Sequence, residues 1–159
     1  MSSETKREYG VIDPAQARTM SGVDFLRGWI EGRFPAPPIG KFMNGGLVEA
    51  ESGRVVFEGT PGADHYNPLG GVHGGYAATL LDSCMGCAVH SALAAGQGYT
   101  TLELKVNYVR PMSDRTGLVR AEGRLIHLGG RVATAEGRVN DAAGKLIAHG
   151  STTCLVFPI

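Results

Sequence analysis

Gly74, Gly75 and Asp82 have residue types and a spacing that could form a reactive site. The two glycines follow a glycine-rich loop, residues 70–73, and stand at or just inside the start of a predicted helix. The first N–H groups of a helix have no partner within it, and glycine lets a ligand come close to them. We expect the Gly74 N–H to hold a carbonyl oxygen that becomes negative. Alternatively, both glycines serve only the turn and tight helix packing.

Asp82 is the one carboxylate in a stretch of small and apolar residues that runs to Gly96. A helix that is apolar on all sides is normally buried, and an acid on it usually has a partner or a function. We therefore treat Asp82 as a candidate base. A purely structural Asp82 would instead hydrogen-bond to Thr79 or Ser83, or help to form a subunit contact.

The separation of Gly74 and Asp82 sets a condition on this site. Eight helical residues rise by about 12 Å, whereas a carbonyl oxygen must lie about 3 Å from its N–H donor. Asp82 therefore cannot reach a carbonyl bound at Gly74 of its own helix. Two antiparallel copies of the helix, related by a two-fold axis, would bring Gly74 of one chain to Asp82 of the other. We predict a homodimer with two such sites.

Two further polar residues precede the predicted helix. A histidine at a helix start is more often a structural hydrogen-bonding group than a general base, so we expect His73 to orient the site. The side-chain amide of Asn67 could donate to a substrate oxygen. Alternatively, Asn67 forms an Asx turn before Pro68.

The cysteines do not predict a metal or redox site. Cys84 and Cys87 have a CxxC spacing and His90 follows them, but the sequence has no second CxxC. Three ligands on one buried helix face would form a poor tetrahedron. We expect buried thiols and no metal. Gly86, between the cysteines, would mark the close approach of another group.

The elements that position these residues follow from apolar periodicity and turn signals. Helices are expected over residues 13–34, where Asp13-Pro14 suits a helix start, and over the long segment from about Gly74. Strands are expected over Phe42 to Ala50, Arg54 to Gly59, Tyr99 to Val109, Gly117 to Leu128, Arg131 to Asn140 and Lys145 to Phe157. This order predicts an α+β protein whose long helix covers one face of an antiparallel sheet.

Two patterns refine these elements. In the strand after the long helix, apolar residues at even positions from Leu102 to Tyr108 are expected on one face. Polar residues at odd positions from Thr101 to Asn107 are expected on the other face. The N-terminal helix has an apolar face that packs on the core or closes one side of a ligand tunnel, formed by Phe25, Leu26, Trp29 and Ile30.

Composition narrows the possible partners. A length of 159 residues fits one domain, and 43% apolar residues are enough for a core. The 15 basic and 15 acidic residues balance, which argues against nucleic acid or an anionic membrane as the main partner. No apolar stretch approaches the roughly 20 residues that span a bilayer. Three cysteines and no apolar export signal lead us to expect a cytoplasmic protein with free thiols.

The motif Asn67-x5-His73-Gly74-Gly75-x6-Asp82 resembles the hotdog-fold acyl-CoA thioesterases, in particular the phenylacetate-degradation type. The likeness extends to the segments YTTLELKVNYVRP, HLGGRVATAEG and AHGSTTCLVF, and covers about residues 42–157. It implies a hotdog fold, in which a curved antiparallel sheet wraps a long helix and two subunits together build two sites. The chain would then divide into an N-terminal helical extension, residues 1–40, and a hotdog thioesterase domain, residues 41–159.

By position, the resemblance also implies roles for single residues. Asp82 would be the base or nucleophile, the Gly74 N–H the oxyanion donor, and Thr101 a hydroxyl that helps to position water beside the acid. Asn67 would touch the thioester oxygen and His73 would orient it. Substrate and CoA contacts are expected at Gly75, Arg110, Gly129, Gly130 and Arg131. Alternatively, Gly129 and Gly130 only form a tight hairpin, and Arg131 is only a surface charge. Some relatives have Glu where this chain has Asp82, which leaves direct attack and attack through water both open.

The expected activity is hydrolysis of an acyl-CoA thioester, with an aryl or medium-chain acyl group, to a free acid and CoA. No cofactor beyond the CoA of the substrate, and no nucleic acid or membrane, is expected as a partner. The assembly would be a dimer or a dimer of dimers. One alternative is a hotdog-fold enoyl-CoA hydratase or dehydratase that uses Asp64 and His73, which are spaced more widely than expected for one. The other is a non-catalytic acyl-CoA-binding protein.

Overall fold

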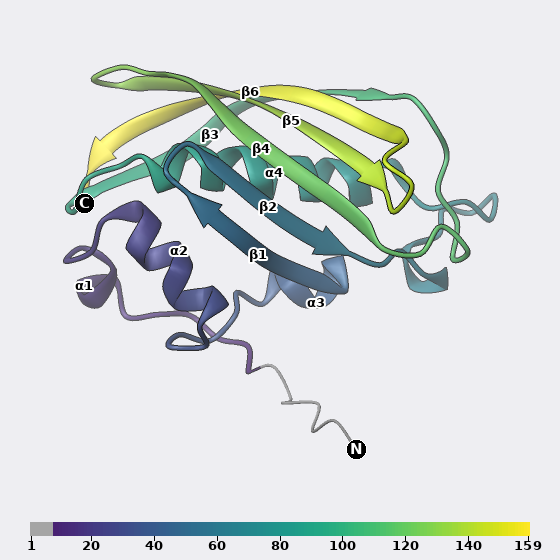
Figure 1. The fold of residues 1–159 in the computed structure, drawn as a ribbon, viewed down its shortest axis with the longest axis horizontal. Coiled ribbons are helices and arrows are strands. Elements are labelled where there is room, and N and C mark those ends of the chain that lie inside the picture. Colours follow the sequence, from purple (N-terminus) through teal and green to yellow (C-terminus); the bar gives the residue numbers. More distant parts are fainter. Residues whose placement is uncertain (1–7) are drawn as a thin grey trace.

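A six-stranded antiparallel sheet and one long helix form the body of the protein (Figure 1). The structure is a computed structural model that describes residues 8–159. The helix α4 spans Gly74–Ser91, and the strands lie in the order β1-β2-β4-β5-β6-β3. The strands are β1 (Gly45–Glu51), β2 (Arg54–Gly59), β3 (Gln97–Tyr108), β4 (Val119–Leu128), β5 (Val132–Asp141) and β6 (Leu146–Pro158). The predicted α+β class, with one long helix against the sheet, is confirmed.

The helix α4 lies close to the sheet because glycines stand beneath it. Gly123, Gly137 and Gly150 are direct cross-strand neighbours on β4, β5 and β6. A Cβ atom on Gly123 would lie 2.2 Å from the Cys84 carbonyl oxygen, and one on Gly137 would lie 2.8 Å from the Met85 side chain. Only glycine permits so close an approach. This row of glycines therefore sets the depth at which α4 and its buried side chains lie.

Three short helices precede the sheet, and the single helix predicted for residues 13–34 is wrong. The chain breaks after the first turn because Ser21 starts a new helix, with its Oγ accepting from the Asp24 N–H at 3.3 Å. The Gly22 N–H donates to the Leu93 carbonyl at 3.0 Å, which fixes this start against the end of α4. The Ser21-x-x-Asp24 pattern in the sequence is typical of such a helix start. The helices are α1 (Pro14–Ala17), α2 (Gly22–Ile30) and α3 (Ile39–Met43).

The first strand begins later than predicted. The expected strand from Phe42 starts at Gly45, because α3 occupies the preceding residues and ends at Asn44 in a left-handed conformation with φ 47°. Asparagine is one of the few residues that adopt this conformation readily at a helix end. The division into an extension of residues 1–40 and a domain of residues 41–159 stays a prediction, and residues 1–7 lie outside the described chain. Within residues 8–159, no helix is both long and apolar enough to cross a membrane.

A bulge in β3 changes the predicted alternation. Thr101 pairs with Cys154 and Glu103 pairs with Thr153, so Leu102 is an extra residue between two pairs. The expectation that Leu102 shares a face with Leu104, and Thr101 the opposite face, is therefore wrong. Leu102 is 59% exposed, whereas the Thr101 hydroxyl reaches α4. An extra residue shifts the period of a strand by one, and here it brings Thr101 to the helix.

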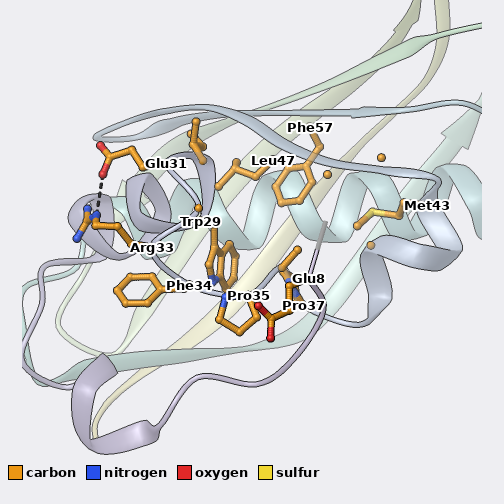
Figure 2. Close-up of a pocket in the computed structure, with 16 residues that line it drawn as sticks. Glu8, Trp29, Glu31, Arg33, Phe34, Pro35, Pro37, Met43, Leu47 and Phe57 are labelled. Atoms are coloured by element: carbon orange, nitrogen blue, oxygen red, sulfur yellow. Dashed lines mark hydrogen bonds and ion pairs between the residues drawn. The ribbon is translucent and has the colours of Figure 1, made fainter. Parts of the chain in front are cut away.

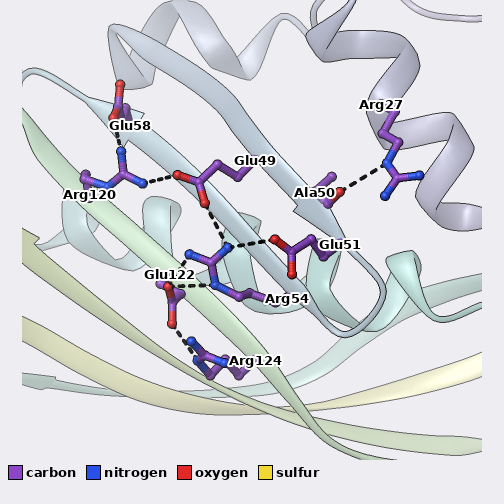
Figure 3. Close-up of polar contacts among 9 residues, drawn as sticks. All are labelled: Arg27, Glu49, Ala50, Glu51, Arg54, Glu58, Arg120, Glu122 and Arg124. Carbon is purple, nitrogen blue, oxygen red and sulfur yellow. Dashed lines mark hydrogen bonds and ion pairs between the residues drawn. The ribbon is translucent and has the colours of Figure 1, made fainter.

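Paired charges cover the outer face of the β1, β2 and β4 strands (Figure 3). Arg54 donates to Glu49 at 2.8 Å and to Glu122 at 2.7 Å, and Arg120 bridges Glu49 and Glu58. These arginines hold the pKa of the Glu49 carboxyl below its ordinary value. Charged side chains on an edge strand discourage pairing with another chain. The β1 edge is therefore protected.

Candidate active site

The start of α4 leaves one backbone donor unused. His73 caps the helix, and its Nδ1 accepts from the Gly75 N–H at 2.8 Å. The Tyr76 N–H donates to the His73 carbonyl at 2.9 Å. Within the described chain, no acceptor is bonded to the Gly74 N–H. The helix start therefore presents the Gly74 N–H, and not that of Gly75, to a ligand.

A buried histidine fixes the loop that leads into α4. The carbonyl of His65 accepts from the His73 N–H at 2.7 Å. The His65 ring lies between two backbone groups: Nδ1 accepts from the Gly62 N–H at 2.8 Å, and Nε2 lies 2.6 Å from the Phe42 carbonyl oxygen. Since Nδ1 is an acceptor, the proton is on Nε2, which donates to Phe42. This neutral His65 joins the loop to α3 and holds His73 in place.

Asn67 forms an Asx turn, which was one of the two roles expected for it. Its Oδ1 accepts from the Leu69 N–H at 2.9 Å and from the Gly71 N–H at 3.3 Å. The loop closes further through the Asn67 N–H, which donates to the Gly71 carbonyl at 2.7 Å. Because Oδ1 is engaged, the amide NH₂ is the part of Asn67 that could donate to a substrate. That contact stays a prediction.

Asp82 is half-buried and is held by β3. The Thr101 hydroxyl donates to its Oδ1 at 2.9 Å. The neighbouring hydroxyls on α4 bond elsewhere: Thr79 donates to the Gly75 carbonyl at 2.8 Å, and Ser83 donates to the Met43 sulfur at 3.8 Å. A structural Asp82 bonded to Thr79 or Ser83 is therefore not observed. The carboxylate is oriented from the sheet instead.

The thiols near Asp82 are buried and protonated. Burial, followed by the negative charge of Asp82, raises the pKa of Cys87 to about 12, although Cys87 also hydrogen-bonds to the Tyr99 hydroxyl. Burial also raises the pKa of Cys84. Thiols of this kind carry little of the reactive thiolate. Gly86 marks the expected close approach, since a Cβ atom there would lie 2.7 Å from the Tyr99 hydroxyl. Within residues 8–159, no three His, Cys, Asp or Glu side chains are grouped closely enough to hold a metal ion.

Tyr108 lies next to the site, although no role was predicted for it. Its hydroxyl donates to the Gly74 carbonyl at 2.9 Å, and its ring lies 3.1 Å from the position of a Cβ atom on Gly74. The strand alternation places Tyr108 on the inner face, but it does not show what the side chain touches. Tyr108, Arg110 and Gly74 also line a hollow of about 360 Å³. This hollow is where a ligand could approach the Gly74 N–H.

Other predicted residues lie apart from this hollow. Gly130 and Arg131 line a second hollow of about 290 Å³ with Gln97 and the end of β6. Gly129 closes the β4–β5 hairpin through its N–H, which donates to the Val132 carbonyl at 2.8 Å. Gln97 begins β3, whereas Arg110 follows the end of β3 at Tyr108. Eleven steps along a strand are about 36 Å. One chain therefore does not bring Arg110 to Gly130 and Arg131.

Gly74 and Asp82 are also too far apart within one chain to form a site. Gly74 and Asp82 lie on one uninterrupted helix, so their axial distance is about 12 Å, as expected from the sequence. Asp64, which a hydratase would use, is exposed on the short helix η1 (Ala63–His65). The Nδ1 atom of its expected partner, His73, is already bonded to the Gly75 N–H. A single chain therefore does not assemble a Gly74–Asp82 site, and its His73 Nδ1 is not free to bond to Asp64.

Comparison with known proteins gives a consistent result. The family model described as Thioesterase superfamily matches residues 69–148. The Homo sapiens protein named acyl-coenzyme A thioesterase 13 is 31% identical over 108 residues, which are 67% of this chain and 76% of the human one. The match includes the loop and helix that carry Gly74 and Asp82, since both residues lie within the region of the family model.

Solved structures share the fold. A phenylacetic acid degradation-related protein of Ralstonia eutropha superposes with a TM-score of 0.74 at 26% identity, over 82% of this chain and 98% of that one. A Streptococcus mutans protein solved with bound acetyl-CoA has a TM-score of 0.66 at 26% identity, over 74% of this chain and 91% of that one. The sheet and the long helix are therefore a known arrangement, and one protein with this arrangement has been seen with a CoA thioester bound.

Proposed function

The chain belongs to the thioesterase superfamily, a family of thioester hydrolases, and we propose that it hydrolyses an acyl-CoA thioester to a free acid and CoA. The observation that carries this proposal is the state of its two reactive groups. Asp82 is half-buried and oriented by one hydrogen bond from Thr101, and the Gly74 N–H has no acceptor within the described chain. An oriented carboxylate and a free backbone donor are what hydrolysis of a thioester requires.

The catalytic roles follow from this geometry. The thioester oxygen accepts from the Gly74 N–H, which stabilises the negative charge that develops on it, and the Asn67 amide gives a second donor. Asp82 takes a proton from the attacking water, or attacks the carbonyl carbon itself. Thr101 orients the carboxylate, and His73 fixes the helix start. The C–S bond then breaks, and CoA leaves as the thiolate, which takes up a proton. After direct attack by Asp82, water hydrolyses the acyl–Asp82 anhydride that remains and releases the free acid.

We infer that each site is built by two subunits, since Gly74 and Asp82 of one helix cannot reach the same carbonyl. The edge strand β3 supports this. It has twelve residues and, within residues 8–159, pairs only with β6. Its exposed side chains include Leu102 and Tyr108, at 59% and 57%, among polar ones such as Lys105. A long edge strand with unpaired backbone groups is suited to pairing with a second chain. The other edge, β1, carries paired charges instead.

The predicted CoA contacts fit the same dimer. Antiparallel pairing of two β3 strands places the Tyr108 end of one chain near the Gln97 end of the other. Arg110 of one subunit then lies on the side of Gly130 and Arg131 of the other, although these residues are far apart in one chain. A single two-fold axis would thus bring together Gly74 with Asp82, and Arg110 with the hollow at Arg131. A dimer of dimers would add a second interface, for which we propose no surface.

For the acyl group we propose an aryl or medium-chain substituent. The Ralstonia eutropha relative is described as phenylacetic acid degradation-related, and the Streptococcus mutans relative was solved with acetyl-CoA. These descriptions concern the relatives, and they guide the choice of esters to assay: acetyl-CoA, octanoyl-CoA and phenylacetyl-CoA.

The test is Asp82→Asn in a thiol-release assay with these three esters. Loss of a positioned base is expected to lower kcat by about 10²- to 10⁴-fold, with little change in KM. The matched control is Asp64→Asn, the same change at an exposed position, which should keep wild-type turnover. Wild-type turnover by Asp82→Asn would remove Asp82 from the mechanism. Hydration of crotonyl-CoA without thiol release, lost in Asp64→Asn, would favour a hydratase. Ester binding with no turnover by the wild type would favour a binding protein.

A further inference from the structure

A cavity of about 560 Å³ lies between the N-terminal segment and β1 (Figure 2). One side is formed by residues 29–37, which end α2 and continue into the loop after it. The other side is formed by the start of β1 together with Met43 and Phe57. This volume lies within the range of sites that bind small organic groups, about 300–1,000 Å³. None of the residues predicted to be catalytic lines this cavity.

The wall of the cavity has about as much polar as apolar surface, and its apolar part is rich in rings. Its side chains include Trp29, Phe34, Leu47, Met43 and Phe57, together with two prolines of the loop (Figure 2). The charged side chains are Glu8, Glu31 and Arg33, of which the last two form an ion pair with each other at 2.7 Å. The apolar part of this wall suits an apolar ligand group.

The rings of this wall are held in place by their own contacts. Trp29 packs edge-on against Phe25 with ring centroids 4.9 Å apart, and Phe34 stacks on Phe25 at 5.9 Å. A Cβ atom on Gly28 would lie 2.1 Å from the Phe34 ring, so glycine is needed for Phe34 to lie there. The loop is also tied down, because the Ala36 N–H donates to the Glu8 carbonyl at 2.8 Å. The cavity is therefore largely preformed.

Met43 connects the cavity to the part of α4 that carries Asp82. Its side chain lines the cavity, and its sulfur accepts a hydrogen bond from the Ser83 hydroxyl at 3.8 Å. Ser83 directly follows Asp82, and both side chains are half-buried, in contrast to the fully buried Leu80, Leu81 and Cys84 nearby. The residue next to Asp82 is thus in direct contact with a side chain of the cavity wall.

We propose that this cavity binds the acyl group of the substrate and favours an aryl group. This inference rests on the proposed function, because it takes the ligand to be an acyl-CoA whose carbonyl lies at Asp82. Aromatic rings such as Trp29 and Phe34 pack well against another aromatic ring. A rigid ring also loses less conformational freedom on binding than a flexible chain. The N-terminal segment thereby selects the substrate, while α4 performs the chemistry.

Trp29 provides a direct test because it is the one tryptophan in the chain. The Asp82→Asn protein is titrated with phenylacetyl-CoA, and binding is measured both by calorimetry and by tryptophan emission. The emission is expected to change and to saturate with the Kd found by calorimetry, whereas CoA alone should leave it unchanged. Calorimetric binding of phenylacetyl-CoA without a change in emission overturns the proposal, as does a complete lack of binding. A response to octanoyl-CoA but not to phenylacetyl-CoA overturns the preference for an aryl group.

This readout separates the inference from the proposed function. If the wild type releases thiol from acyl-CoA esters but its Trp29 emission does not respond, the thioesterase proposal is supported and acyl binding in the cavity is contradicted. If the protein binds phenylacetyl-CoA with a Trp29 response but hydrolyses no ester, binding in the cavity is supported and the thioesterase proposal is contradicted.

A substitution gives a second, kinetic test. Leu47→Phe places a larger side chain at the cavity wall and should raise KM for phenylacetyl-CoA about 10-fold more than KM for acetyl-CoA, since small changes in pocket volume are worth roughly 10- to 200-fold. The matched control is Leu118→Phe, at a position that is 43% exposed and away from the cavity. An unchanged ratio of the two KM values in a folded Leu47→Phe protein contradicts the proposal.

Discussion

The carboxylate of Asp82 owes its orientation to one side chain. Thr101 donates to Oδ1 at 2.9 Å, and its position results from the bulge at Leu102. A hydrogen bond to a charged group is worth about 1.5–3 kcal/mol, so its loss should weaken any function of the oriented acid.

Thr101→Val keeps the shape of the side chain and removes this hydrogen bond. We expect kcat to fall by about 10- to 100-fold, with little change in KM, because Asp82 can then rotate away from the reacting carbonyl. Thiol-release kinetics measure the effect. Thr153→Val is the matched control, since that hydroxyl donates to the exposed Glu103 carboxylate at 3.3 Å. Equal kinetics for the two variants would mean that Thr101 does not orient the acid.

Tyr108 acts on the other reactive group, through the Gly74 carbonyl. Removing its hydroxyl in Tyr108→Phe costs one neutral hydrogen bond at the helix start, worth about 0.5–1.5 kcal/mol. We expect kcat to fall by about 2- to 10-fold while the melting temperature stays close to that of the wild type. Tyr66→Phe, which loses a hydrogen bond to the exposed Asp114, is the control. A change in melting temperature without a change in kcat would make Tyr108 purely structural.

The residue types and spacing in the sequence pointed to Asp82 and Gly74, and the resemblance pointed to Thr101. The structure places Thr101 against Asp82, but the catalytic roles stay predictions. Tyr108 was missed because a strand pattern gives the face of a side chain, not the atom that it touches. The role of Asn67 was left open between two alternatives. The structure shows the Asx turn, in which two N–H groups of the loop donate to the Asn67 side chain.

At the scale of elements, the junction of α2, α4 and β3 depends on a half-buried histidine, His90. The His90 ring lies between Phe25 of α2, at a centroid distance of 5.3 Å, and Tyr99 of β3, at 5.7 Å. Burial lowers the pKa of His90 below its ordinary value of 6.5. Burial, and after it the charges of its neighbours, raises the pKa of Tyr99, so Tyr99 stays neutral near pH 7.

Because the pKa of His90 is lowered in the folded protein, we predict that the protein loses stability in mild acid. The unfolded chain takes up a proton at His90 as the pH falls through about 6.5, whereas the folded chain resists protonation, so protons favour unfolding. Between pH 7.5 and 5.5 the melting temperature should fall more for the wild type than for His90→Gln. The carboxyls with lowered pKa values, Glu49 and Glu122, titrate below 4.5 and lie outside this window. His149→Gln, at an exposed site, should keep the wild-type slope.

Most of the sheet could be predicted from the sequence, because alternation and short turns define β2 to β6 within a few residues. The N-terminal segment could not, for two local reasons. The predicted helix ran through residues 18–21, although Ser21 caps a second helix there. Asn44 ends α3 in a left-handed conformation, where the sequence reads as the middle of a strand. The cavity beside Trp29 depends on both features, so it could not be predicted.

At the scale of the whole molecule, the proposal requires two chains. Along the one helix, Gly74 and Asp82 are about 12 Å apart, and along the one sheet Arg110 is at the opposite end of β3 from the hollow that holds Arg131. The sequence predicted the first separation from helix geometry. The second needed the structure, because it depends on which strand ends lie together.

The most direct measurement of a shared site is complementation between two inactive variants. Asp82→Asn lacks the carboxylate. Gly74→Pro lacks the N–H, and proline is tolerated at the first helical position. Each homodimer should be inactive. A heterodimer, co-expressed with two tags and purified through both, pairs the intact Gly74 of one chain with the intact Asp82 of the other. We expect about half of the wild-type turnover per dimer, since one of its two symmetric sites is complete. A folded heterodimer without thiol release would contradict a site that is shared between subunits.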